Sequence, residues 1–159
     1  MGLGDFFKNM FGKKNCALCG KECGMLHRSK SKNKEFRCSD CGNLCSKYIR
    51  LSELTLDEIK GHIEYMKRQN RLYEEVYSKE GEKSTCPSTL KEMGVEFCDD
   101  LGMFRIVYRS DTSRGKLKEL FRYDQVASYE EYIEENPAAE PGKNPEFKEC
   151  GLKIKLLGG

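Results

Sequence analysis

The feature that most limits how this chain can fold is a pair of CxxC motifs near its N-terminus. Cys16 and Cys19 form the first motif, and Cys38 and Cys41 form the second after an 18-residue gap. Each CxxC turn places two thiolates on one side of the backbone, and two such turns supply the four sulfurs of a tetrahedral site. The gap falls within the spacing of about 15–20 residues found in four-cysteine zinc sites. The sequence therefore predicts a structural Zn²⁺ ion bound by these four cysteines.

Other uses of the two motifs are less favoured. The chain has nine cysteines, an odd number, and no recognisable secretory leader, which argues against a disulfide framework. A redox CxxC usually occurs once, whereas a rubredoxin-like iron site has the same spacing as zinc. Four thiolates leave no open position for a catalytic metal. Gly20 and Gly42 follow the two motifs, and we expect both to take the positive φ that such turns require.

The other cysteines are expected to pack rather than bind metal. Cys23 and Cys45 each follow the second cysteine of a motif by four residues, and we expect both to be small buried side chains. The alternative is that they bind a second metal or alternate as ligands of the first. His27 could also replace one cysteine as a ligand. Packing is the expectation for the isolated cysteines as well: Cys86, Cys98 and Cys150.

Charge divides the chain near residue 50. Residues 13–50 hold ten basic and three acidic side chains, whereas residues 51–159 hold 17 basic and 22 acidic ones. A nucleic-acid-binding function is one alternative, because basic residues concentrate between the motifs. The simpler interpretation is a solvated basic turn, because Phe36 is the one aromatic residue there. The candidate nucleic-acid contacts in this loop, residues 28–37, are Arg28, Lys30, Lys32, Lys34 and Arg37.

The sequence predicts an α+β protein in four parts: an apolar arm (1–12), a zinc ribbon (13–50), a helix and linker (51–80) and an antiparallel β domain (81–159). Thr55 and Glu58 form a capping box that starts a helix over 55–78. Its stripe suits either packing on the chain's own domains or a homodimer whose register Asn70 fixes. His62 is expected at the helix surface. The stripe consists of Leu56, Ile59, Ile63, Met66, Asn70, Tyr73 and Tyr77.

The C-terminal part is expected to be a small antiparallel sheet or partial barrel. Gly81 and Pro87 mark a linker, after which 95–99 and 103–109 form a hairpin around the turn 100–102. Residues 111–115 form another turn. Further strands are expected over 117–123, 126–133 and 147–157, with a loop over 134–144.

The sequence also gives expectations for the cellular location and for the N-terminal arm. No run approaches the roughly 18 consecutive apolar residues of a membrane span, so we expect a cytoplasmic protein. The arm is expected to dock as a short helix on the protein or on a partner, with peripheral membrane contact as the alternative. Its apolar residues are Phe6, Phe7, Met10 and Phe11.

Taken together, the Cys16–Cys45 ribbon and the segments 56–65 and 120–130 resemble an uncharacterised bacterial zinc-ribbon family, catalogued as a domain of unknown function. In that family a ribbon commonly follows a Phe-rich arm and precedes a helix and a β-rich region similar to pleckstrin-homology-like folds. The resemblance implies metal ligation by the four CxxC cysteines and an apolar packing role at the position of Cys23. It implies no activity.

The leading functional hypothesis is a non-enzymatic scaffold or interaction protein with a structural zinc site and an unidentified protein partner. The chain has two histidines, no Gly-rich phosphate loop and no nucleophile elbow. The alternatives are nucleic-acid binding through loop 28–37 and peripheral membrane association through the arm and the β module.

Overall fold

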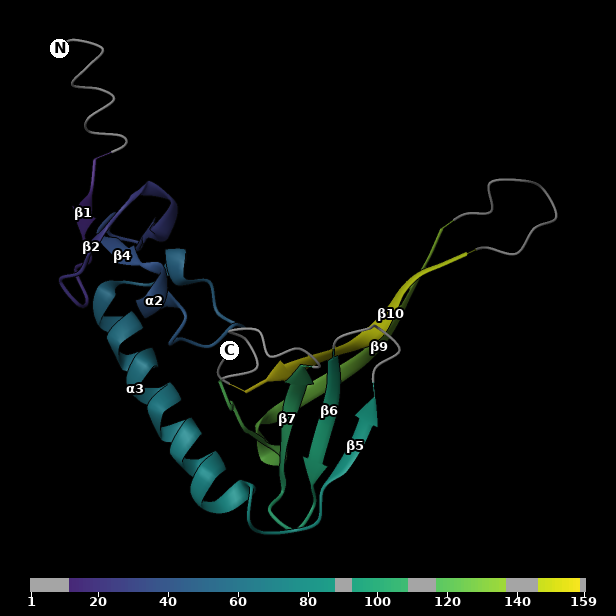
Figure 1. Cartoon of the computed structure of the whole chain (residues 1–159). Helices are drawn as coiled ribbons and strands as arrows, with labels where there is room; N and C mark the ends of the chain where they lie inside the picture. The colour runs from purple at the N-terminus through teal and green to yellow at the C-terminus, as the bar shows by residue number, and fades with distance from the viewer. Residues whose placement is uncertain (1–11, 88–92, 109–116, 137–145, 158–159) are drawn as a thin grey trace.

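The fold is described from a computed structural model, which defines residues 12–87, 93–108, 117–136 and 146–157. Their order is a cysteine-rich ribbon, a long helix and antiparallel β-structure (Figure 1). The α+β class predicted from the sequence is confirmed. Among the described residues, no helix combines the length and apolar composition needed to cross a bilayer.

The ribbon consists of two small hairpins and a helical turn. Strand β1 pairs with β2 around the first CxxC motif, and β3 pairs with β4 just before the second. The second motif continues into α2, whose first turn the Cys38 sulfur caps by accepting from the Cys41 N–H. The bounds are β1 (Lys14–Asn15), β2 (Glu22–Cys23), β3 (Arg28–Lys30), β4 (Phe36–Cys38) and α2 (Ser39–Gly42).

The long helix α3 (Leu56–Leu72) begins where the capping box predicts. Oγ1 of Thr55 accepts from the Glu58 N–H at 3.3 Å, and Oε2 of Glu58 accepts from the Thr55 N–H at 2.7 Å. At its C-terminal end the helix changes to a π-helical turn, η3 (Tyr73–Tyr77), closed by the Ser78 N–H on the Tyr73 carbonyl. The prediction of one uninterrupted helix to residue 78 is therefore wrong in its last turn.

The helix packs on the chain's own elements. Ile59, Met66 and Tyr77 are buried, and Asn70 Oδ1 accepts from the Lys118 N–H at 3.0 Å. The neighbouring Gln69 Oε1 accepts from the Leu120 N–H at 3.1 Å. These contacts favour the interpretation in which the stripe lies on its own domains. A homodimer stays a prediction.

The predicted hairpin 95–109 is confirmed as β6 (Met93–Cys98) and β7 (Met103–Tyr108). Two corrections follow. First, the expected linker contains a strand, β5 (Ser84–Pro87), which pairs with β6. Second, β9 (Val126–Asn136) and β10 (Glu146–Leu156) form a hairpin of their own, separate from the sheet β5-β6-β7-β8. Strand β8 is confined to Phe121–Arg122, so the described strands do not close into a barrel. The expected turn 111–115 and most of the loop 134–144 lie outside the described residues.

Alternate residues of each strand point to opposite faces of the sheet, and each face makes contacts of its own. On one face Cys98 and Met103 pack with Tyr77 and Leu120 beside the helix end. On the other face Phe104 and Phe121 stack at 5.4 Å, and an apolar pocket separates them from β10. The pocket is lined by Tyr48, Phe104, Ile106, Phe121, Ile154 and Leu156.

Candidate metal centre

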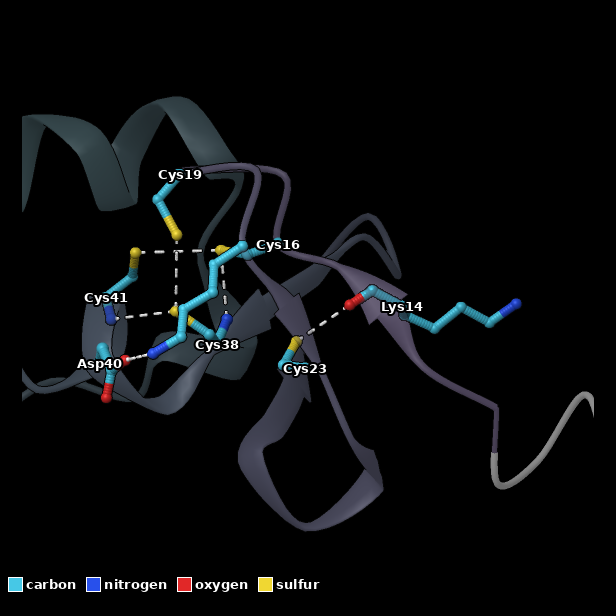
Figure 2. A network of polar contacts seen from close by, with 8 residues as sticks. Lys14, Cys16, Cys19, Cys23, Cys38, Asp40 and Cys41 are labelled. Atoms are coloured by element: carbon cyan, nitrogen blue, oxygen red, sulfur yellow. Dashed lines mark hydrogen bonds and ion pairs between the residues drawn. The ribbon is translucent and has the colours of Figure 1, made fainter.

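The four cysteines of the CxxC motifs converge on one point. Their sulfur atoms all lie within 4.8 Å of one another. The Cys16 and Cys41 sulfurs are 3.9 Å apart, and those of Cys19 and Cys38 are 3.7 Å apart. Figure 2 shows the four side chains pointing inward from the two motifs. A tetrahedron with metal–sulfur bonds of about 2.3 Å has edges of about 3.8 Å. The sulfur cage therefore fits a four-thiolate metal ion, and it is far too wide for disulfides.

Backbone geometry holds the first motif in place. The Gly20 N–H donates to the Cys16 carbonyl and the Cys16 N–H donates to the Lys21 carbonyl, both at 2.8 Å. Gly20 has φ +75°, as predicted, a left-handed backbone conformation that residues with a side chain rarely adopt.

The second glycine serves a different purpose. Gly42 lies within α2 and does not have a positive φ. A Cβ at this position would overlap Nη1 of Arg37 and contact Leu51. The expectation of positive φ at Gly42 is wrong, and the absence of a Cβ here instead leaves room for the end of the Arg37 side chain.

N–H groups support the sulfurs electrostatically. The Cys38 N–H donates to the Cys16 sulfur at 3.2 Å, and the Cys41 N–H donates to the Cys38 sulfur at 3.4 Å. Burial alone would raise the pKa of the Cys16 thiol, but N–H donors, with Cys38 first among them, lower it to about 6. Burial and three neighbouring sulfurs raise the pKa of Cys41 above its usual range. Four thiolates thus repel one another at this distance, and a bound dication removes that repulsion.

The cysteines that follow each motif lie outside the cage. Cys23 is 5% exposed, and its thiol donates to the Lys14 carbonyl at 3.1 Å, away from the four sulfurs (Figure 2). Cys45 is fully buried with its thiol near the carbonyls of Cys41 and Ile59. The packing prediction is confirmed for both. Among the described residues, His27 does not join the cluster that could hold a metal.

The predictions for the three isolated cysteines and for His62 are confirmed in some cases and wrong in others. Cys98 is buried as expected, but Cys86 is exposed, so the packing prediction for Cys86 is wrong. The side chain of Cys150 is not among those that the structure describes. His62 is partly buried, and its Nδ1 is enclosed without a hydrogen-bond partner. Burial lowers the pKa of His62, so the expectation of an exposed surface histidine is wrong as well.

The candidate nucleic-acid residues do not act as one exposed surface. Lys30, Lys32 and Lys34 are exposed on the β3–β4 hairpin and its turn. Arg37 is only 9% exposed and packs over Gly42. The guanidinium of Arg28 and the ammonium of Lys30 lie over the Phe36 ring, 4.9 Å and 5.4 Å from its centroid. Two cations therefore already lie over the ring that stacking on a base would use.

Two ionic residues beside the cage were missed by sequence reasoning. Lys21 follows the first motif, Asp40 lies inside the second, and their side chains pair at 2.6 Å. The pair links the two motifs at the surface, and Asp40 raises the pKa of Lys21. The ion pair could have been predicted from the sequence, because two residues of opposite charge lie close to the cysteines of the two motifs.

A polar junction joins the ribbon, the helix and the β region. Glu119 accepts from the Ser46 hydroxyl at 2.6 Å and forms a hydrogen bond with Tyr65. Burial raises the pKa of Glu119 despite these two donors. The Tyr48 ring meets Phe121 nearby at 5.8 Å. No local sequence signal predicts this junction, because Ser46 and Glu119 are 73 positions apart.

Comparison with known families supports the ribbon assignment. Residues 14–62 match the model of a family described as a domain of unknown function, DUF4428. The matched range runs from β1 into α3 and includes Ile59, against which Cys45 packs. Comparisons with curated proteins and with solved structures gave no match. The family match and the four-cysteine cluster together fit an uncharacterised zinc-ribbon-like domain in this part of the chain.

Proposed function

We propose that the protein is a non-enzymatic interaction module whose ribbon is folded around a structural Zn²⁺ ion. The observation that carries the proposal is the sulfur cage of Cys16, Cys19, Cys38 and Cys41, with edges near those of a zinc–thiolate tetrahedron. Four sulfurs complete the coordination sphere, so the metal has no position at which to activate water. Zinc in such a site stabilises the fold, and contacts with a partner are made by residues on the surface of the protein.

We favour zinc as the bound metal, although a cage of four thiolates also binds iron. The described cysteines are free thiols, which suits a reducing compartment such as the cytoplasm. We place the protein there. The pleckstrin-homology-like interpretation of the β region is kept as part of this proposal, with the sheet and the β9–β10 hairpin as its candidate elements.

Metal analysis of the purified full-length protein tests the proposal. We expect about one zinc per chain, lost in Cys16→Ser and Cys38→Ser because each removes one corner of the cage. Cys86→Ser is the matched control, since it removes an exposed cysteine outside the cluster. Equal metal loss in the control, or a wild-type protein that binds no metal, would contradict the proposal. A ferric–thiolate absorption band would assign iron instead.

Nucleic-acid binding is a second candidate, favoured by the exposed Lys30, Lys32 and Lys34. Affinity for short DNA and RNA measured at two salt concentrations tests it. A real phosphate interaction weakens steeply with salt and is lost when these lysines are reversed in charge. Arg37 should have no part in it, because its side chain is buried.

A further inference from the structure

The most exposed apolar feature of the ribbon is the turn between β2 and β3. This turn, η1 (Met25–His27), contains no buried residue. Leu26 is 88% exposed and its neighbour Met25 is 44% exposed. One exposed leucine is ordinary on a protein surface. Two adjacent exposed apolar side chains on one turn offer more apolar surface for docking than a single leucine does. We refer to Met25 and Leu26 as the apolar tip.

The apolar tip is held by the ribbon on both sides. The His27 N–H donates to the Gly24 carbonyl at 3.1 Å, which closes the turn. Before the turn, the buried Cys23 is fixed by its bond to the Lys14 carbonyl. After it, Arg28 pairs in register with Cys38, a member of the sulfur cage. The tip is therefore presented by the metal-bound scaffold at little further cost in conformational entropy.

Basic residues lie on the strands next to the apolar tip. Lys14 lies opposite Cys23 in the β1–β2 pairing, and Arg28 and Lys30 lie together over Phe36. The two acidic residues beside the turn are both paired, Glu22 with Lys13 at 3.1 Å and Asp40 with Lys21 at 2.6 Å. An apolar projection bordered by positive charge matches the surface of an anionic bilayer, with an apolar interior beneath negative headgroups.

The described chain begins beside Arg28, whose guanidinium donates to the carbonyl of Gly12. The residues that precede Gly12 in the sequence include Phe7, Met10 and Phe11, which lie outside the described residues. A protein partner is a poorer match, because a stable interface buries about 800 Å² on each side and two residues offer far less.

We propose that the ribbon docks on anionic membrane surfaces by inserting Leu26 and Met25 among the headgroups while Lys14, Arg28 and Lys30 contact lipid phosphates. The inference rests on the proposed function, since it requires the metal-bound ribbon, and it names the partner of that interaction module. The apolar contact through Met25 and Leu26 lies outside the basic loop 28–37, whereas Arg28 and Lys30 belong to it.

Sedimentation of the zinc-loaded full-length protein with lipid vesicles tests the inference. We expect binding to phosphatidylcholine vesicles containing about one third phosphatidylserine, and weak binding to phosphatidylcholine alone. Leu26→Glu should weaken binding at least tenfold, because burying a leucine side chain changes a partition constant by about ten- to a hundredfold. Leu44→Glu is the matched control, since Leu44 is 48% exposed elsewhere on the ribbon, and it should bind like wild type.

A second pair of variants separates the tip from the basic turn. Lys30→Ala should weaken vesicle binding about fivefold, the effect of one basic residue at an anionic surface. Lys32→Ala, in the distant turn of the hairpin, should change it little. Unchanged binding by Leu26→Glu overturns the inference, and so does affinity for duplex DNA or RNA that follows Lys32 and ignores Leu26.

Metal content measured on the same samples keeps the two proposals apart. A protein that carries full zinc but does not bind the anionic vesicles overturns the membrane inference and leaves the structural zinc site standing. A wild-type protein that binds no metal overturns the proposed function itself.

Discussion

The ribbon and the β region are stabilised in opposite ways. The buried cluster of the ribbon consists of four cysteines, Cys16, Cys23, Cys38 and Cys41, with Leu18 beside it. The sheet instead buries large rings: Phe104 is 4% exposed and Phe121 8%. Aromatic side chains of this size stabilise a core by their own burial, whereas thiols bury little apolar area. If the proposed zinc site is correct, we expect the ribbon to need its metal to fold and the sheet to fold without it.

The helix α3 connects these two kinds of stability. Near its start, Ile59 is fully buried, and its carbonyl accepts from the Cys45 thiol of the ribbon at 4.0 Å. Near its end, Tyr77 is buried against the sheet and donates to the Glu96 carbonyl at 3.3 Å. The loss of either partner should therefore loosen one half of the helix while the other half keeps its packing.

Removal of the metal should have the largest effect and should be confined to the ribbon. Binding of structural zinc is worth about 10–16 kcal/mol in small zinc domains, and that energy is folding energy. In Cys41→Ser, or after chelation, the amides of residues 14–54 should lose protection from hydrogen exchange. The amides of β6 and β7 should keep theirs. Simultaneous loss of protection in both regions would contradict independent stabilisation.

The reciprocal change is Phe104→Ala. It should lower the free energy of unfolding of the sheet by about 3–5 kcal/mol, because Phe104 is buried and stacks with Phe121. The zinc content should stay at the wild-type value. Denaturant unfolding followed together with metal release measures both quantities, and metal loss at the sheet transition would show that the regions unfold as one.

The contact between Asn70 and the backbone of Lys118 allows a smaller test. Asn70→Ala leaves the Lys118 N–H without its acceptor and should cost about 1–3 kcal/mol. Asn70→Asp is the matched control, because it keeps an acceptor oxygen at the same place. Thermal unfolding compares the two variants. A change in oligomeric state by sedimentation, without a loss of stability, would favour the coiled-coil dimer instead.

The junction carboxyl of Glu119 predicts the smallest effect and one that depends on pH. Burial raises its pKa in the folded state, so the folded protein holds this proton to higher pH than the unfolded chain does. Its contribution to stability is therefore present below the unfolded pKa and is lost as pH rises through the folded pKa. Glu119→Gln should gain in melting temperature over wild type on going from pH 4 to pH 7. A difference that does not vary with pH would contradict this assignment.

Local features of the fold could be predicted from the sequence. The ligand set depends on spacing within two short turns, and the start of α3 depends on Thr55 and Glu58, three positions apart. The β6–β7 hairpin follows from alternation around a turn closed at Gly102, which has φ +60°. In each case the sequence signal itself lies within a few neighbouring residues.

The features that sequence reasoning missed depend on distant contacts. The partner of Asn70 could not be predicted, because the hydrogen bond that its Oδ1 accepts from the Lys118 N–H spans 48 positions. Gly42 was assigned a backbone role because the approach of Arg37 depends on how β4 packs against α2. Strand β5 contains Pro87 and reads as a linker until β6 supplies its partner.

X-ray absorption at the zinc edge of the purified protein tests directly whether the four cysteines form a closed zinc site. We expect a single shell of four sulfur neighbours at about 2.3 Å with no nitrogen or oxygen ligand. The same spectrum should be obtained from Cys23→Ser, because its sulfur points to the Lys14 carbonyl and not into the cage. A shell containing nitrogen or oxygen, or fewer than four sulfurs, would contradict a closed structural site formed by Cys16, Cys19, Cys38 and Cys41.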